Sequence, residues 1–364
     1  MVTRRMLALP AVWLLAGAAC VMVFALRAGA DPEAGDPMLR LALHRHGEAQ
    51  QVLWETRKRH LEPAVLRDVE RQDAVRSGMI GVEWSPLTTT AGTLDAKRAT
   101  TAPGWVPLFR RWYRELDLQP GDRVAISSSA SFPALFYAAR LAAESLGLET
   151  QSVISLTASN YGANLPGFDY WAMEEALRRR DVLPPSVLGV TPGGHGDAGL
   201  DLEAEAREAL RLRIEAIAER RDGPAVIWPG SLDESREFRR RLLLEQAPPD
   251  VYVSIGGHVT GYGTGARVLS VPRGLVRPDT LSSGALPESV LGDALRLGIP
   301  VLNVLDIRGI MADEGLAPGS EAPLEPLSPA RRALALAGVL FLVVAIVRLG
   351  RPQPPPIPDE ENVA

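Results

Sequence analysis

Short apolar runs alternate with amphipathic segments through the middle of the chain. The runs lie at residues 123–127, 152–157, 186–191, 225–230, 251–257 and 299–307. Between them, apolar residues spaced three or four positions apart predict helices over residues 132–146, 169–180, 200–221, 232–245 and 287–297. Near-continuous apolar strands joined by helices are typical of a mainly parallel sheet with helices on both faces. The pattern therefore predicts an α/β domain over residues 79–314.

Two longer apolar stretches lie near the ends of the chain. Residues 6–26 contain no charged side chain, and about 20 apolar residues suffice for a helix to cross a bilayer. Residues 331–349 form the second stretch, in which Arg331, Arg332 and Arg348 can extend their charged heads to the interfaces. We expect one transmembrane helix at each end, with an uncleaved anchor over residues 1–30. A cleaved signal peptide is the alternative for the first stretch.

The segments between these elements have their own patterns. Residues 31–78 place apolar residues at helical spacing in a charged background and predict a helical stalk. Residues 315–330 predict a proline-rich linker, and the acidic, proline-rich residues 350–364 predict a disordered tail. The basic N-terminus favours placing both ends inside the cytoplasm and the central domain outside it. The expected location is therefore the cell membrane.

Composition narrows the classes of function. The net charge of −5 argues against nonspecific nucleic-acid binding, which requires a basic surface. Cys20 is the single cysteine, so no disulfide can form within the chain. The central domain has few histidines and no close spacing of potential metal ligands, so neither a metal nor a cofactor is expected. A P-loop is excluded because no G-x-x-x-x-G-K-[ST] string is present.

Loops rich in small and polar residues follow the first, second, third and fifth apolar runs. Because parallel strands end at the same edge of a sheet, we expect these loops to gather where such sheets bind ligands. Asn160 and Asn164 in the second loop, and Gly256 and Gly257 in the last, are candidate ligand contacts. The alternative is that these residues only form tight turns.

A serine cluster follows the first apolar run. Ser127, Ser128, Ser129 and Ser131 precede Pro133, which suits the first turn of a helix, and Ser131 is the expected cap. A strand followed by a polar turn and a helix start presents backbone N–H groups to an anion. We expect an anion-binding turn at residues 127–131. A purely structural turn is the alternative.

The same serines are candidate nucleophiles. Ser128 or Ser129 would need a base, and His195 and His258 are the histidines of the predicted sheet region. A histidine paired with Asp197 would complete a hydrolase constellation. The G-x-S-x-G elbow of many hydrolases is absent, so the sequence favours binding over covalent catalysis.

A run of threonines at residues 87–101 leads to a basic pair, Lys97 and Arg98. This pair could contact a polyanion through charge-assisted hydrogen bonds. A solvated polar loop is the alternative.

Four stretches carry a resemblance to a known family: GVEWSPLTTTAGTLDAKRATT (81–101), SSSASFPAL (127–135), SVISLTASNYGAN (152–164) and VYVSIGGHVTGYGTG (251–265). Over residues 79–310, and in having an anchor at each end, the chain resembles the poly-gamma-glutamate system protein family of bacterial membrane proteins. The resemblance implies an accessory component of poly-γ-glutamate synthesis or export. Its implied partners are the ligase and membrane subunits, the γ-glutamyl polymer and the lipid bilayer. An extracytoplasmic hydrolase or transferase acting on γ-glutamyl bonds is the alternative, and the resemblance assigns no catalytic residue.

Overall fold

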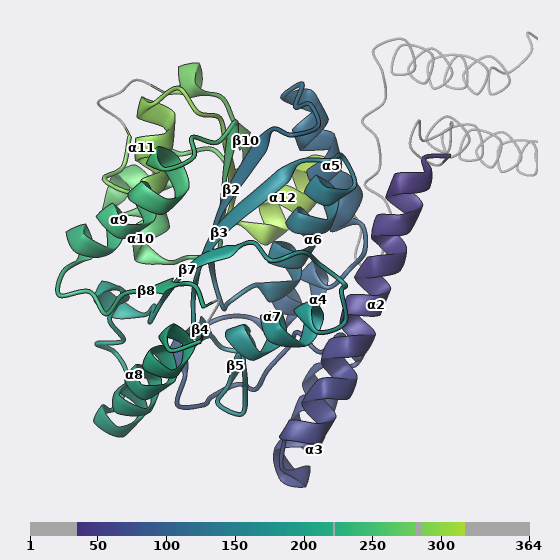
Figure 1. Cartoon of the computed structure of the whole chain (residues 1–364), viewed down its shortest axis with the longest axis vertical. Coiled ribbons are helices and arrows are strands. Elements are labelled where there is room, and N and C mark those ends of the chain that lie inside the picture. The colour runs from purple at the N-terminus through teal and green to yellow at the C-terminus, as the bar shows by residue number, and fades with distance from the viewer. Residues whose placement is uncertain (1–34, 221–222, 282–285, 317–364) are drawn as a thin grey trace, which may run out of the picture. The chain divides into compact units, whose positions relative to one another are not determined.

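The computed structural model of the chain describes residues 35–220, 223–281 and 286–316 (Figure 1). The predicted transmembrane helices at residues 6–26 and 331–349, the tail and most of the predicted linker lie outside these ranges. In the described ranges, every helix is too short or too polar to cross a bilayer.

A seven-stranded sheet forms the centre of the domain. All six apolar runs are strands of this sheet and pair in parallel, which confirms the predicted sheet. The seventh strand is antiparallel, only three residues long, and was not predicted. In spatial order the strands are β10 (Gly274–Val276), β11 (Val301–Val304), β9 (Val251–Ile255), β2 (Arg123–Ser129), β3 (Glu149–Ser155), β7 (Val187–Thr191) and β8 (Ala225–Val226).

Helices cover both faces of the sheet (Figure 1). Successive strand residues point to opposite faces, so Val124 and Ile126 join one buried cluster and Ala125 joins the other. The first cluster includes residues of α2 (Pro37–His60), α3 (Pro63–Gln72), α5 (Trp105–Glu115), α6 (Pro133–Glu144), α7 (Tyr170–Arg178), α8 (Ala204–Ala218) and α12 (Ile307–Glu314). The second includes residues of α9 (Leu232–Arg240), its π-helical extension Arg241–Glu245, α10 (Val259–Tyr262) and α11 (Val290–Arg296).

Short elements surround the carboxyl edge of the sheet. The helix α4 (Leu94–Thr100) follows β1 (Thr88–Thr90), and β1 pairs in parallel with β4 (Ala158–Ser159). A small antiparallel pair is formed by β5 (Asn164–Leu165) and β6 (Phe168–Asp169). The 3₁₀ turns are His195–Asp197, Ala266–Ser270 and Pro278–Thr280.

The segment predicted as a stalk is helical but belongs to the domain. Leu53 and Trp54 of α2 are buried in the first cluster, and α2 packs against α6 and α7. The fully buried Arg57 forms an ion pair of 2.8 Å with Asp73 and donates to the carbonyl of Ile80. The expectation of a separate stalk over residues 31–78 is therefore corrected. Its charged residues Arg45 and Asp36 likewise pair with Glu144 and Arg110 of the domain.

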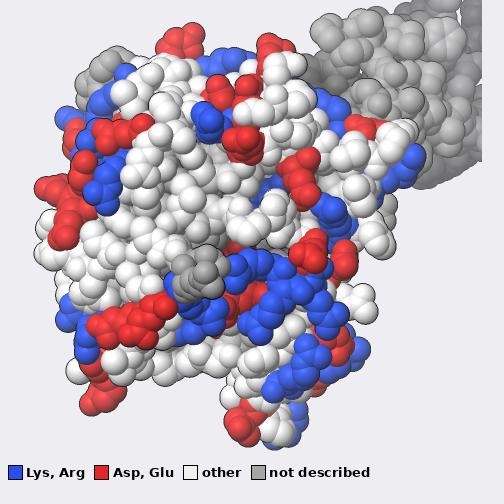
Figure 2. All heavy atoms as spheres, in the orientation of Figure 1, with Lys and Arg blue, Asp and Glu red and all other residues white. Residues whose placement is uncertain are grey.

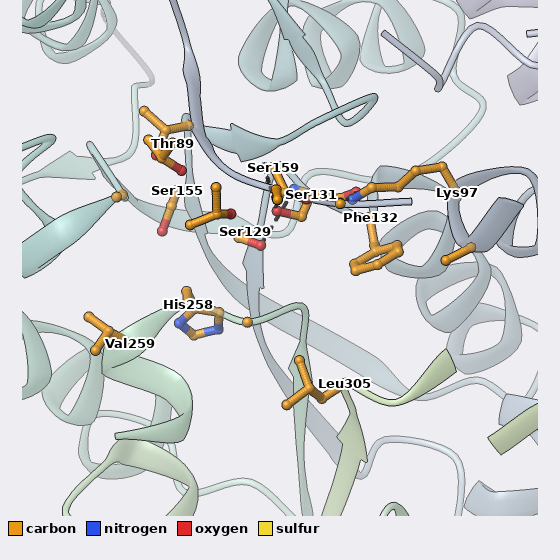
Figure 3. Close-up of a pocket in the computed structure, with 18 of the residues that line it drawn as sticks. Thr89, Lys97, Ser129, Ser131, Phe132, Ser155, Ser159, His258, Val259 and Leu305 are labelled. Atoms are coloured by element: carbon orange, nitrogen blue, oxygen red, sulfur yellow. Dashed lines mark hydrogen bonds between the residues drawn. The ribbon is translucent and has the colours of Figure 1, made fainter. Parts of the chain in front are cut away.

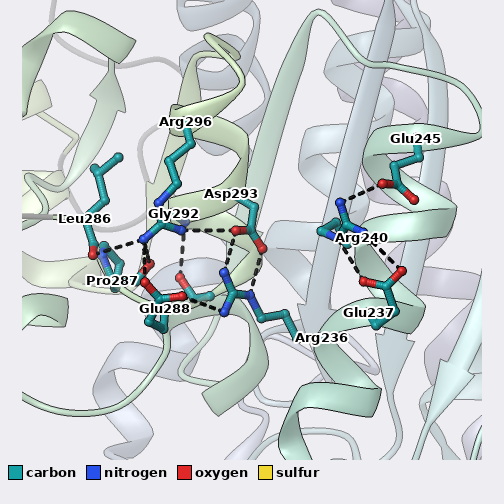
Figure 4. A network of polar contacts seen from close by, with 11 residues as sticks. Arg236, Glu237, Arg240, Glu245, Leu286, Pro287, Glu288, Gly292, Asp293 and Arg296 are labelled. Atoms are coloured by element: carbon teal, nitrogen blue, oxygen red, sulfur yellow. Dashed lines mark hydrogen bonds and ion pairs between the residues drawn. The ribbon is translucent and has the colours of Figure 1, made fainter. Parts of the chain in front are cut away.

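Ion pairs on the opposite face join α9 to α11. Arg236 contacts Asp293 and Glu288, and Arg296 contacts the same two carboxylates (Figure 4). Exposed pairs contribute about 0–1 kcal/mol each, so this network aligns the two helices more than it stabilises them.

Figure 2 shows acidic and basic side chains interspersed on the face it views, with a largely uncharged area between them.

Candidate functional site

A cavity opens where the strand order changes direction. From β2 the chain continues to β3, β7 and β8 on one side, and then returns to place β9 and β11 on the other. Such a switch point leaves a crevice at the carboxyl ends of the strands. The cavity there measures about 560 Å³ and is lined by residues that follow β2, β3, β7, β9 and β11. The prediction that these loops gather at one edge is confirmed.

Some of the residues predicted from sequence line this cavity and others do not. Figure 3 shows Lys97 beside Ser131 and Ser159, with His258 on the facing wall. The predicted residues that line the cavity are Lys97, Ser129, Ser131, His195, Gly257 and His258. Those outside its lining are Arg98, Ser127, Ser128, Asn160, Asn164, Asp197 and Gly256.

The serine cluster is not the predicted turn. The strand β2 extends to Ser129, and the buried Ser128 hydroxyl contacts Tyr170 Oη at 3.0 Å. Phe132, rather than Ser131, is the N-cap of α6. Ser131 Oγ instead accepts from the backbone N–H of Ser159 at 3.0 Å. Only Ser129 and Ser131 of the cluster face the cavity.

The two asparagines hold the segment that crosses the cavity. Asn164 Nδ2 donates to the carbonyl of Val82 at 2.8 Å, and Asn164 Oδ1 accepts from the Val82 N–H. Asn160 Oδ1 accepts from the N–H of Gly92 at 2.9 Å. These bonds fix residues 82–92, including the cavity residue Thr89, against β4. The predicted ligand contacts are thus positioning residues.

A glycine is required where β9 leaves the sheet. Gly256 has φ +77°, and a Cβ there would lie 2.5 Å from Ser129 Oγ. The positive φ and the close approach both exclude larger residues. Gly256 therefore lets the backbone after β9 lie close to Ser129, which lines the cavity.

His258 is committed to backbone groups. Its Nδ1 accepts from the N–H of Gly261 at 2.9 Å, so the ring proton is assigned to Nε2, which lies 3.3 Å from the carbonyl of Ser127. Burial, assisted by the charge of Arg239, lowers the pKa of His258 to about 3. With both ring nitrogens occupied, His258 cannot take a proton from a serine. The predicted role as a base is corrected.

Asp197 has a structural partner. Its carboxylate, which is 1% exposed, pairs with Arg239 and accepts from Ser235. Asp197 lies in a loop whose glycines at positions 193, 194, 196 and 199 all have positive φ. His195 is exposed at the mouth of the cavity, and its backbone N–H donates to Asp201. Within the described residues, the serine, histidine and aspartate of the predicted hydrolase are not joined by hydrogen bonds.

Lys97 is the buried cation of the cavity. Its side chain is 3% exposed, and Nζ donates to Ser159 Oγ at 2.8 Å and to the carbonyl of Ser131. Nζ also lies 3.7 Å from the centroid of the Phe132 ring. No carboxylate of the described residues pairs with Lys97. Burial lowers its pKa to about 7, so the ammonium and amine forms coexist near neutral pH.

Arg98, the predicted partner of Lys97, lies on the other side of α4. It is exposed and donates to the carbonyls of Gln72 and Arg71. The two residues are neighbours in sequence but differ in burial and surroundings. Arg98 is therefore a matched control for experiments on Lys97.

The mouth of the cavity adds a second cation. Arg308 is exposed there and has no ion-pair partner among the described residues. The carboxylates of the mouth are engaged: Asp306 pairs with Arg273 at 3.0 Å, and Asp201 accepts from backbone. Sequence reasoning missed Arg308 because an exposed arginine carries no pattern of its own.

A buried hydroxyl also faces the cavity without a partner. Thr157 is 2% exposed, and its Oγ1 has no hydrogen bond within the described part of the chain. A buried hydroxyl left in this state costs about 1–3 kcal/mol. Ser129 and Thr89 also line the cavity, and the Thr89 hydroxyl donates to the carbonyl of Ala158 at 3.3 Å.

Two further findings concern metal ligands and known proteins. No group of three or more His, Cys, Asp or Glu side chains within residues 35–220, 223–281 and 286–316 is placed to hold a metal ion. Comparison with known protein families, curated proteins and solved structures found no match.

Proposed function

We propose that the chain is a membrane-anchored accessory component of bacterial poly-γ-glutamate synthesis or export, and that its cavity binds a γ-glutamyl segment. A γ-glutamyl unit carries a free carboxylate and an amide, which match a cation flanked by hydroxyls. The cavity volume of about 560 Å³ falls in the range of roughly 300–1,000 Å³ typical of ligand sites. The family resemblance of the sequence supplies the pathway.

Lys97 is the observation that carries the proposal. A buried ammonium without a carboxylate is unfavourable in the empty protein and becomes favourable when a ligand supplies the counter-charge. The cavity keeps this cation at its inner wall and Arg308 at its mouth. This distribution suits an anion that enters with its carboxylate first.

Binding of a short γ-linked glutamate oligomer to the full chain in detergent micelles tests the proposal. We expect Lys97→Met to weaken binding about tenfold or more, because a charge-assisted hydrogen bond contributes about 1.5–3 kcal/mol. Arg98→Met should bind as the unaltered protein does. An equal loss in both variants, or no loss in either, would contradict the proposal.

The membrane arrangement is part of the proposal. We place residues 6–26 and 331–349 across the bilayer, with both termini in the cytoplasm and the cavity outside, where ligase and membrane subunits would deliver the polymer. A fluorescent reporter that matures only in the cytoplasm, fused after Ala364, should be bright. A dark fusion, with a secreted phosphatase active at the same position, would reverse the placement of the whole domain.

A further inference from the structure

Ser159 and Lys97 form a contact that the binding role does not require. Ser159 Oγ and Lys97 Nζ lie 2.8 Å apart, although the residues are 62 positions apart in sequence. Both line the cavity, and both are at least nine-tenths buried. A serine hydroxyl within hydrogen-bond reach of a lysine amine is the arrangement that activates a nucleophile.

Backbone contacts position Ser159. It lies on β4, which pairs with β1, and its N–H donates to Ser131 Oγ at 3.0 Å. A Cβ at position 92 would lie 3.0 Å from Ser159 Oγ, so Gly92 leaves room beside the hydroxyl. Lys97 Nζ is fixed in turn by the carbonyl of Ser131 and the ring of Phe132. The two reacting atoms are thus positioned before a ligand arrives.

We infer that Ser159 and Lys97 are a nucleophile and its general base, and that the cavity performs acyl transfer on an amide bond of a bound carboxylate-bearing chain. The identity of that chain as γ-glutamyl rests on the proposed function, whereas the reactive pair does not. The lowered pKa of Lys97 supports the inference, because a base must be partly unprotonated near neutral pH.

The reaction is balanced with water as the second substrate. In the fraction of complexes in which Lys97 is neutral, its amine accepts the hydroxyl proton while Ser159 Oγ attacks the amide carbon. The carbon–nitrogen bond breaks, and the Lys97 ammonium gives its proton to the departing amine, which leaves an ester on Ser159. Water then attacks the ester, Lys97 accepts a proton from the water, and that proton returns to Ser159 Oγ as the acid leaves. An amine replacing water would give transfer instead of hydrolysis.

The other serines of the cavity have different partners. Ser155 Oγ accepts from the Arg239 guanidinium at 2.7 Å, and arginine cannot lose its proton near neutral pH to act as a base. Ser131 Oγ accepts from the backbone of Ser159. Ser129 Oγ has a long contact of 3.4 Å to the N–H of Ser131 and no hydrogen bond to a basic side chain in the described structure. Ser159 is therefore the one that the geometry selects.

A fluorophosphonate probe, which forms a stable adduct with activated serines, tests the pair in the full-length protein in detergent micelles. We expect intact-mass analysis to show one adduct and peptide mapping to place it on Ser159. Ser159→Ala should remove the adduct. Lys97→Met should reduce the labelling rate at least a hundredfold. Ser128→Ala, which alters a buried serine outside the cavity, and Arg98→Met should label at the original rate.

Lys97→Arg separates this inference from the proposed function. Arginine keeps the positive charge but cannot act as a base at neutral pH, so we expect oligomer binding to persist and labelling to be lost. If the unaltered protein does not bind the oligomer but Ser159 is still labelled, the proposed ligand is wrong and the reactive pair of Ser159 and Lys97 is supported. Absence of an adduct on folded protein, an adduct on another serine, or an undiminished rate in Lys97→Met would overturn the inference.

Discussion

Asp197→Asn should lower the free energy of unfolding by about 3–5 kcal/mol, because it leaves the Arg239 guanidinium buried without its counter-charge. Arg239 is 0% exposed and contacts Ser155 and Thr191 as well as Asp197. Asparagine preserves the shape and tolerates the φ of 58° at this position. The substitution therefore isolates the loss of charge. Urea unfolding of the full chain in detergent, followed by tryptophan fluorescence, measures the effect.

Asp201→Asn is the matched control for this prediction. Asp201 lies in the same loop but is exposed, and it accepts from the N–H of His195. We expect a change below about 1 kcal/mol. Adding Arg239→Met to Asp197→Asn should recover part of the lost stability, since the uncompensated charge is then gone. Unfolding of Asp197→Asn at the same urea concentration as the original protein would show that the pair does not hold the loop.

Lys97→Met should stabilise the fold at pH 6 while it weakens ligand binding. The pKa of Lys97 is about 7 in the folded protein and 10.5 ordinarily, so the unfolded chain binds the proton more tightly. Below pH 7 both states are protonated, and the folded state carries the full cost of the buried charge. Methionine removes this cost but leaves the carbonyl of Ser131 without its donor. We expect a net gain of about 1–4 kcal/mol at pH 6.

The dependence on pH identifies the cause of this gain. Between pH 7 and 10.5 the original protein regains stability by about 1.4 kcal/mol per pH unit as the folded lysine becomes neutral. The advantage of Lys97→Met should therefore shrink or reverse at pH 9.5. Arg98→Met should show no such trend, because Arg98 is exposed. An equal effect of Lys97→Met at both pH values would mean that the buried lysine bears no charge-related cost.

The sheet was predictable because buried parallel strands leave uninterrupted apolar runs in the sequence. The serines were predicted as a turn, although they continue a strand of the same sheet. Strand β2 continues through Ser127 and Ser128, and the Tyr170 hydroxyl contacts the hydroxyl of Ser128, which a sequence pattern assigns to a turn. Helix α5 was not predicted, and the guanidinium of its buried Arg110 contacts Ser145 and Asp36.

The sequence predicted where the candidate site lies, but it did not predict which side chains contact one another there. The loops were found because parallel strands share an edge, and Lys97 was found because it stands in a conspicuous basic pair. The contact between Lys97 on α4 and Ser159 on β4 joins residues 62 positions apart, which no local spacing reveals. The sequence predicted His258 as a base. It could not show that the carbonyl of Ser127 and the N–H of Gly261 occupy the two ring nitrogens in the fold.

The central claim is that Lys97 receives a ligand carboxylate. Calorimetric titration tests it most directly: the full chain is titrated with a γ-linked glutamate oligomer at pH 7 in two buffers of different ionisation enthalpy. A carboxylate beside Lys97 raises its pKa, so binding should be accompanied by uptake of about half a proton. Arg98→Met should take up the same amount, and Lys97→Met should bind weakly with no uptake from this group. Tight binding without proton uptake, or uptake that persists in Lys97→Met, would contradict the account.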